Sequence, residues 1–186
     1  MTQPRDDEVL ALQIGRPLRA RSRVLRRCSL GLPIVAEVPP LLDTGEPFPT
    51  RYWLTCPLAH RRIARIEARG GVRVAQAKLD ANPELAAAFR HTHVRYAKER
   101  DAALPSSARH RPSGGVGGSS GTVTCLHAQY ADFAAGTDNS VGRDVAAQIQ
   151  EPRCDAPCVC FIDGELRRNP DWQEPVQGSS DDAPKD

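Results

Sequence analysis

The stretch RYWLTCPLAHRRIARIEARGG, residues 51–71, joins a strand to a helix, and the rest of the fold can be built outward from this junction. Its first five residues are aromatic or β-branched in part and predict a short strand. Pro57 suits the first position of a helix, which places Cys56 at or next to the N-cap. Apolar residues then recur at spacings of four and three, as they do on one face of a helix: Ala59, Ile63 and Ile66. Two glycines end the helix.

The segments on either side extend this pattern to a mixed fold. Two short runs rich in β-branched residues, 23–28 and 33–38, flank a glycine-containing turn and predict a hairpin. Capped or amphipathic runs predict helices at 6–15, 72–81, 83–104, 122–136 with Thr122 or Thr124 as its cap, and within 137–150, while CVCFI predicts a strand over 158–162. The predicted fold class is therefore α+β, with a small sheet of three or four short strands and helices on one face.

Length and composition predict a single domain. The chain of 186 residues is long enough to bury one core without disulfides. We expect a flexible N-terminus over 1–7, one α+β domain over 8–163 that carries a Gly/Ser-rich loop at 105–121, and an acidic disordered tail over 164–186. No run approaches the ~20 apolar residues of a membrane-spanning helix, and the first residues do not resemble a signal peptide. A soluble cytoplasmic protein without a membrane partner is the expectation.

The six cysteines are the main chemical signal. In a reducing compartment they are not expected to form a disulfide framework, so they are ligands, nucleophiles or small buried residues. One hypothesis is a zinc or iron–sulfur site to which remote segments contribute the following donors: Cys28, Cys56, Cys125 and either His127 or Cys158. On a regular helix Cys125 and His127 point about 200° apart, so joint ligation requires an irregular first turn.

Two other interpretations of the cysteines stay open. A thiol enzyme would use Cys56 or Cys125 as nucleophile, because a helix N-terminus favours the thiolate, with His127 or His93 as base and amides of the glycine loop as an oxyanion hole. Alternatively, the cysteines are buried apolar residues, and His93 is a hydrogen-bonded core histidine on the apolar face of its helix.

Charge is distributed unevenly and suggests an anionic partner. Residues 1–150 carry 21 basic and 14 acidic residues, whereas 151–186 carry 4 basic and 9 acidic ones. The stretch 16–27 holds six arginines and no acid, but it lacks aromatic residues for stacking, so specific nucleic-acid binding is not expected. A phosphate or polyphosphate module is a third hypothesis, and it would use the basic part of the glycine loop: Arg109, His110 and Arg111.

Several motifs over roughly residues 8–160 resemble one bacterial family, found mainly in actinobacteria, that is known as domain of unknown function 501. The motifs are the hairpin RC-x-x-G-x-P from Arg27, the PFPT run from Pro47, the LTCP helix start from Leu54, and CLHA from Cys125. The usual N-P-x-G element appears with serine at position 140 in place of proline. The resemblance implies no activity, cofactor or catalytic residue, because none is assigned to the family.

Overall fold

A computed structural model describes residues 5–175 of the chain. It contains a three-stranded antiparallel sheet in the order β1-β2-β3, with Val35 of the central strand opposite Leu54. The bounds are β1 (Arg23–Arg27), β2 (Pro33–Glu37) and β3 (Tyr52–Leu54). Gly31, at a φ of 77°, makes the tight turn between the first two strands, where its amide donates to the carbonyl of Cys28. The predicted hairpin and third strand are confirmed.

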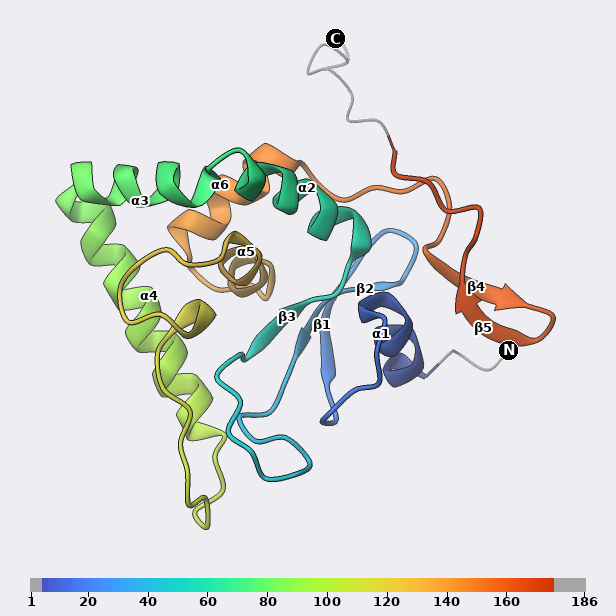
Figure 1. The fold of residues 1–186 in the computed structure, drawn as a ribbon, viewed down its shortest axis with the longest axis horizontal. Coiled ribbons are helices and arrows are strands. Elements are labelled where there is room, and N and C mark those ends of the chain that lie inside the picture. Colours follow the sequence, from blue (N-terminus) through green and yellow to red (C-terminus); the bar gives the residue numbers. More distant parts are fainter. Residues whose placement is uncertain (1–4, 176–186) are drawn as a thin grey trace, which may run out of the picture.

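Five helices form a layer on one side of the sheet (Figure 1). Helix α5 lies near the middle of this layer, where it contacts α2, α6 and strand β3. The elements are α2 (Pro57–Ala68), α3 (Gly71–Ala81), α4 (Pro83–Ala102), the 3-10 turn η1 (Val116–Gly118), α5 (Leu126–Ala134) and α6 (Ser140–Ile149). Each predicted helix is present, and the α+β class is confirmed as a single compact domain.

The core lies between the central strand and the helices. The first four residues of β2 are buried, and side chains from α2, α4, α5 and α6 pack with them. Helices α5 and α6 approach closely because Gly142 has no side chain: a Cβ there would lie 2.2 Å from the Gln129 carbonyl oxygen. The largest buried apolar side chains of the cluster are Ile34, Leu58, Ile63, Phe89, Tyr96, Leu126 and Ile149. This core fixes α2 against α5, which positions the site described below.

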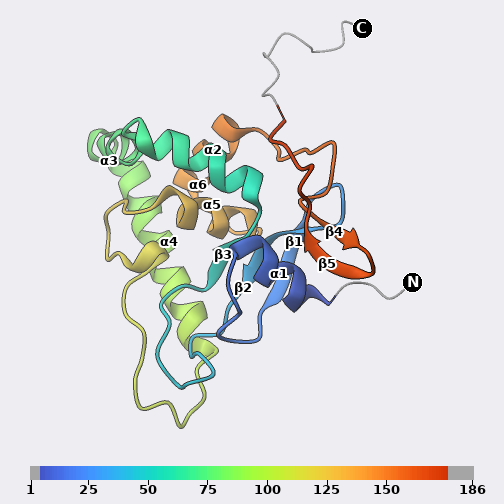
Figure 2. The ribbon, with the colours of Figure 1, turned by 45° about the vertical axis from the view of Figure 1, so that its right-hand side comes forward.

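A helix and a second hairpin pack together beside the sheet (Figure 2). They are α1 (Asp6–Ile14), β4 (Val159–Ile162) and β5 (Glu165–Arg168), and β4 pairs with β5 in antiparallel fashion. Arg168 donates from Nε to the Leu12 carbonyl at 2.6 Å, which ties the hairpin to the end of α1. Trp172 packs against the core beyond it.

The predicted flexible N-terminus and disordered C-terminal tail both include residues that are ordered in the structure. The expectation of disorder from residue 164 is wrong for β5, because its backbone completes a hairpin and Arg168 is anchored on α1. At the other end α1 begins at Asp6, inside the segment expected to be flexible, and Asp6 accepts two hydrogen bonds from Arg27. Residues 1–4 and 176–186 lie outside the described part of the chain.

The Gly/Ser-rich loop is held by buried polar side chains of α4. Arg100 is only 2% exposed and donates to the carbonyls of Pro112, Ser113 and Gly114. The loop thus turns carbonyl oxygens toward a cation, and several of its amides bond within the loop, such as Gly115 to the Ser119 carbonyl. Its role as seen here is structural. None of the helices within residues 5–175 has the length and apolar character that a bilayer crossing demands.

Candidate metal centre

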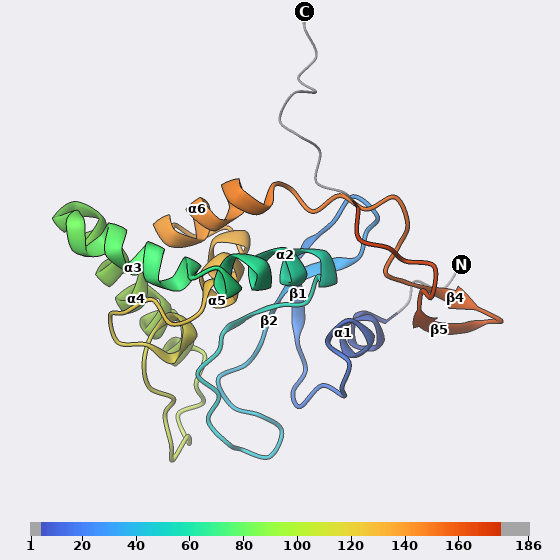
Figure 3. The ribbon, with the colours of Figure 1, turned by 45° about the horizontal axis from the view of Figure 1, so that its top comes forward.

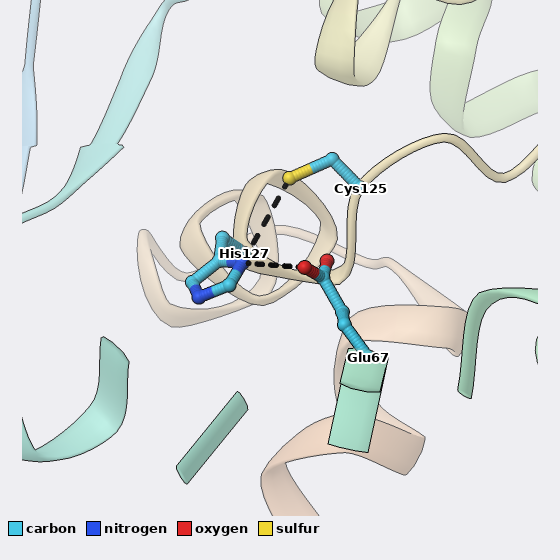
Figure 4. Close-up of side chains that lie close together, drawn as sticks. All are labelled: Glu67, Cys125 and His127. Carbon is cyan, nitrogen blue, oxygen red and sulfur yellow. Dashed lines mark hydrogen bonds and ion pairs between the residues drawn. The ribbon is translucent and has the colours of Figure 1, made fainter. Parts of the chain in front are cut away.

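Three side chains converge where α2 approaches the start of α5 (Figure 4). Nδ1 of His127 lies 3.2 Å from Oε2 of Glu67 and 4.0 Å from Sγ of Cys125. All three potential ligand atoms lie within 4.8 Å of one another. Within residues 5–175 this is the only group of three or more His, Cys, Asp or Glu side chains that meets this distance. The side chains of Glu67 and His127 are 26% and 17% exposed, so the group is accessible yet largely removed from water.

The backbone at the start of α5 brings the two neighbours together. Cys125 is the N-cap residue and is extended, with φ −152° and ψ 119°, while the helix itself begins at Leu126. The two side chains therefore do not follow helical spacing, and the angular objection to joint ligation does not apply. The predicted caps, Thr122 and Thr124, are wrong, because both precede the helix by more than one residue.

Glu67 accepts the hydrogen bond at the start of α5 that the Cys125 side chain does not accept. Cys125 makes no side-chain capping bond, and the amide of Leu126 instead donates to Oε1 of Glu67 at 2.6 Å. The carboxylate thus uses one oxygen to satisfy an amide at the positive end of α5 and turns the other toward His127. Figure 3 shows α2, which carries this residue, lying alongside α5.

The second ring nitrogen of His127 has its own partner. Nε2 lies 3.1 Å from the carbonyl oxygen of His60, to which its N–H donates. His60 is seven residues before Glu67, which places both on the same face of α2, and its ring centroid lies 4.3 Å from that of His127. In the neutral ring this bond leaves the lone pair on Nδ1, the atom that faces the thiol and the carboxylate. Metal-binding histidines are commonly oriented in this way.

The pKa values of His127 and His60 are shifted in opposite directions. Burial lowers the pKa of His127, but its bond with Cys125, the charge of Glu67 and the His60 carbonyl outweigh burial, so the pKa is raised. For His60, burial and the neighbouring His127 lower the pKa, with only a partial opposing effect from Glu67. The site therefore attracts positive charge at Nδ1 of His127.

The spacing of the three atoms suits a tetrahedral ion. With Zn–S near 2.3 Å and Zn–N and Zn–O near 2.0–2.1 Å, tetrahedral angles separate sulfur from nitrogen by about 3.5 Å and nitrogen from oxygen by about 3.3 Å. The corresponding distances here are 4.0 and 3.2 Å. The nitrogen–oxygen separation already matches, and the sulfur–nitrogen separation exceeds the ideal value by about half an ångström. A single thiol does not suit an iron–sulfur cluster, which is held mainly by thiolates.

The other predicted sulfur ligands lie elsewhere. They surround a narrow cavity between α1, the first hairpin and the segment before β4, together with one further cysteine: Cys28, Cys56, Cys154 and Cys158. None of them belongs to the group of Glu67, Cys125 and His127, so two of the five predicted metal ligands meet there and the other three line this cavity. Burial raises the pKa of both Cys154 and Cys158.

The expectation of a reactive thiolate at Cys56 is contradicted. The residue is at the N-cap of α2 as predicted, but it is only 6% exposed. Burial raises its pKa to about 11, although amides of the first helical turn partly oppose this. The desolvation of a charged sulfur therefore outweighs the favourable helix terminus.

The remaining predicted site residues are dispersed. His93 is buried on α4, where burial lowers its pKa and its Nδ1 lies 3.1 Å from the Ser119 carbonyl, so it holds the glycine loop in place. The anion-binding candidates are exposed side chains on that loop: Arg109, His110 and Arg111. The loop does border the metal centre, since a Cβ at Gly117 would lie 3.7 Å from the Cys125 Cβ.

Sequence reasoning missed Glu67. A usable signal exists, because Glu67 is the one acidic residue in α2, a helix with three arginines, and it shares a face with His60. Glu67 reaches Cys125 and His127 only because α2 packs against α5, which is a tertiary contact.

Comparison with known proteins yields one match. No curated protein and no solved structure matched the chain. The profile of a family described as "Protein of unknown function (DUF501)" matches residues 24–147, a span that includes all three residues of the candidate metal centre. Because the match covers well over half of the sequence, the chain belongs to the DUF501 family.

Proposed function

We propose that this protein binds a zinc ion through Glu67, Cys125 and His127. The observation that carries the proposal is the convergence of a thiol, an imidazole nitrogen and a carboxylate oxygen on one point, with separations close to those of a tetrahedral zinc site. The fixed orientation of His127, with its other nitrogen bonded to the His60 carbonyl, supports it.

The number of donors indicates the type of site. Structural zinc sites are closed by four protein ligands, whereas catalytic ones have three and leave the fourth position to water or substrate. Three donors are present here within the described residues. The ion would therefore polarise a bound water or a substrate oxygen, and we assign no specific reaction to it.

Metal analysis tests the proposal directly. The purified chain should hold close to one zinc per molecule, and cobalt substitution should produce a sulfur-to-cobalt charge-transfer band because Cys125 is a ligand. Cys125→Ser and His127→Ala should each lose the metal, and Glu67→Gln should weaken it. Cys160→Ser and His110→Ala are the matched controls, since Cys160 is on β4 and His110 on the exposed loop, and both should retain full zinc.

Two results would overturn the assignment. One is a chain that takes up no stoichiometric zinc and gives a cobalt spectrum without a sulfur band. The other is zinc that survives Cys125→Ser but is lost in Cys56→Ser, which would move the site to the cysteines around the narrow cavity.

A second candidate is a thiol reaction that uses Cys125 and His127 without metal. The contact between Sγ and Nδ1 favours it. Against it, Glu67 faces the same ring nitrogen as the thiol, whereas in a catalytic triad the third residue orients the base through the opposite nitrogen. Alkylation separates the two: a metal ligand becomes reactive only after chelation, while an activated nucleophile reacts equally fast with and without chelator.

A further inference from the structure

A basic cleft is lined by His60, the neighbour of His127, but by none of the three residues of the candidate metal centre. It has a volume of about 580 Å³, within the range of small-molecule sites. Its walls come from three parts of the chain: the end of α1, the junction of β3 with α2, and the β4–β5 hairpin. The charged side chains among its lining residues are Arg16, Arg61 and Arg168, together with the imidazole of His60, and no aspartate or glutamate lines it.

Two of these arginines are positioned by tryptophans. The guanidinium of Arg16 lies over Trp53 at 4.6 Å from the ring centroid, and that of Arg61 lies over Trp172 at 4.9 Å. Stacking of this kind fixes the plane of the guanidinium and leaves its N–H groups free along the edge. Among residues 5–175 neither arginine forms an ion pair, so these donors are not used by a carboxylate.

The third arginine is anchored differently and completes the arrangement. Arg168 donates from Nε to the Leu12 carbonyl and from Nη2 to the Gln13 carbonyl at the end of α1, and Nη1 is left without a described partner. Glu174 interacts electrostatically with Arg61, but its carboxylate is already paired with Arg65. Three cations around one hollow repel one another, and a bound dianion would remove this cost.

We propose that this cleft binds a small ligand through a phosphate group, either a phosphate monoester or a diphosphate. A planar guanidinium matches two phosphate oxygens at once, and three of them exceed what a singly charged carboxylate requires. The volume leaves space beyond one phosphate group. The anion site is thereby placed in the cleft, and not on the exposed loop residues Arg109 and Arg111.

The proposal does not depend on the zinc ion. His60 joins the two sites, because it lines the cleft, its ring contacts that of His127 at a tilt of 42°, and its carbonyl accepts a hydrogen bond from the same residue. The residues that would bind phosphate are nonetheless distinct from Glu67, Cys125 and His127. Phosphate binding can therefore be measured on protein from which metal has been removed.

The test is a calorimetric titration of the metal-free full chain with pyrophosphate and with inorganic phosphate at low ionic strength. We expect one saturable site. Arg16→Gln and Arg61→Gln should each weaken binding at least about tenfold, the usual effect of losing one charge-assisted contact. Arg90→Gln, an exposed arginine of α4 that forms no ion pair within the described residues, makes the same change in net charge and should leave affinity unaltered.

Four outcomes would refute phosphate binding in the cleft. The first is the absence of saturable binding at millimolar pyrophosphate. The second is an equal loss of affinity in Arg61→Gln and Arg90→Gln, which is the result for diffuse attraction. The third is a loss confined to a variant that carries both Arg109→Gln and Arg111→Gln. The fourth is binding that requires added zinc and disappears in Cys125→Ser, because the phosphate would then bind the metal and not the arginines.

Discussion

At the scale of single residues, the arrangement around His127 has a measurable consequence for stability. One nitrogen faces both Cys125 and Glu67, and the pKa of the imidazole is raised above its ordinary value of 6.5 despite burial. A group whose pKa is higher in the folded than in the unfolded chain stabilises the fold fully below the unfolded pKa. That contribution is lost as the pH rises through the folded pKa.

The first prediction follows for metal-free protein. The free energy of unfolding of the wild-type chain should exceed that of His127→Ala by more at pH 5.5 than at pH 8.5, as measured by urea denaturation. Added zinc should reverse the trend, because the metal binds the deprotonated ring and competes with the proton. His110→Ala serves as the control, and a difference between wild type and His127→Ala that does not change with pH would contradict the raised pKa.

The second prediction concerns Cys56. Its pKa of about 11 lies two units above the ordinary 9.0, so the thiolate fraction near pH 8 is about 100-fold lower than for a free cysteine. Alkylation followed by peptide mass spectrometry should find Cys56 modified at least that much more slowly than a model thiol. Rapid modification of Cys56 in the folded chain would show that the helix terminus outweighs burial after all.

Sequence reasoning was effective for some of these residues and not for others. The local pattern around Cys125 and His127 identified two candidate ligands whose side chains the structure brings together. The burial of Cys56 and the approach of Glu67 both depend on which helices pack together, and no local pattern contains that information. The predicted single site is divided for the same reason: Cys125 lies with Glu67 and His127, whereas Cys28, Cys56 and Cys158 line the narrow cavity.

At the scale of elements, two asparagine caps provide a matched comparison. Asn82 caps α4 from an exposed position, where its side chain accepts from two amides. Asn139 caps α6 and is fully buried, and its Nδ2 also donates to Gln129 at 2.8 Å and to Asp132 at 3.0 Å. Asn82 therefore acts only as a helix cap, whereas Asn139 also donates hydrogen bonds to two buried acceptors.

The third prediction contrasts their alanine variants. Asn82→Ala should lower the free energy of unfolding by about 1 kcal/mol, the usual cost of a lost cap. Asn139→Ala should cost about 3 kcal/mol, because it also leaves the buried Oε1 of Gln129 unpaired and removes one of the two donors to Oδ2 of Asp132. Chemical denaturation of both variants measures the difference, and equal losses would mean that water replaces the bonds of Asn139.

Elements with strong local signals were predicted well. Proline at the first position located the starts of α2 and α4, whereas the start of α6 was placed only within residues 137–150. The start of α5 was misplaced, because its first amide is satisfied by Glu67 from another helix and the threonines before it have no capping role. Strand β5 was missed because ELRR is polar, and it is held by pairing with β4 and by Arg168 on α1.

At the scale of the whole molecule, the two proposed sites differ in how they relate to the family. Glu67, Cys125 and His127 all lie within the matched span, residues 24–147. The cleft takes only its β3–α2 wall from that span, while α1 and the β4–β5 hairpin lie outside it. The proposed metal centre can therefore be tested as a property of the matched segment, and the phosphate cleft as one of the whole 186-residue sequence.

The last prediction concerns the effect of zinc on the whole fold. Small zinc modules unfold without metal because they have little core, but here twenty buried residues form one cluster that joins sheet and helices. The metal-free chain should stay folded, with zinc acting as a stabilising ligand. At a free concentration 100-fold above Kd, zinc should add about 2.7 kcal/mol to the free energy of unfolding. For a domain of this size that corresponds to a rise in Tm of about 5–10 °C. Thermal denaturation followed by circular dichroism measures this rise, and Cys125→Ser should show none. A metal-free chain that lacks a cooperative transition would instead make the ion an integral part of the core.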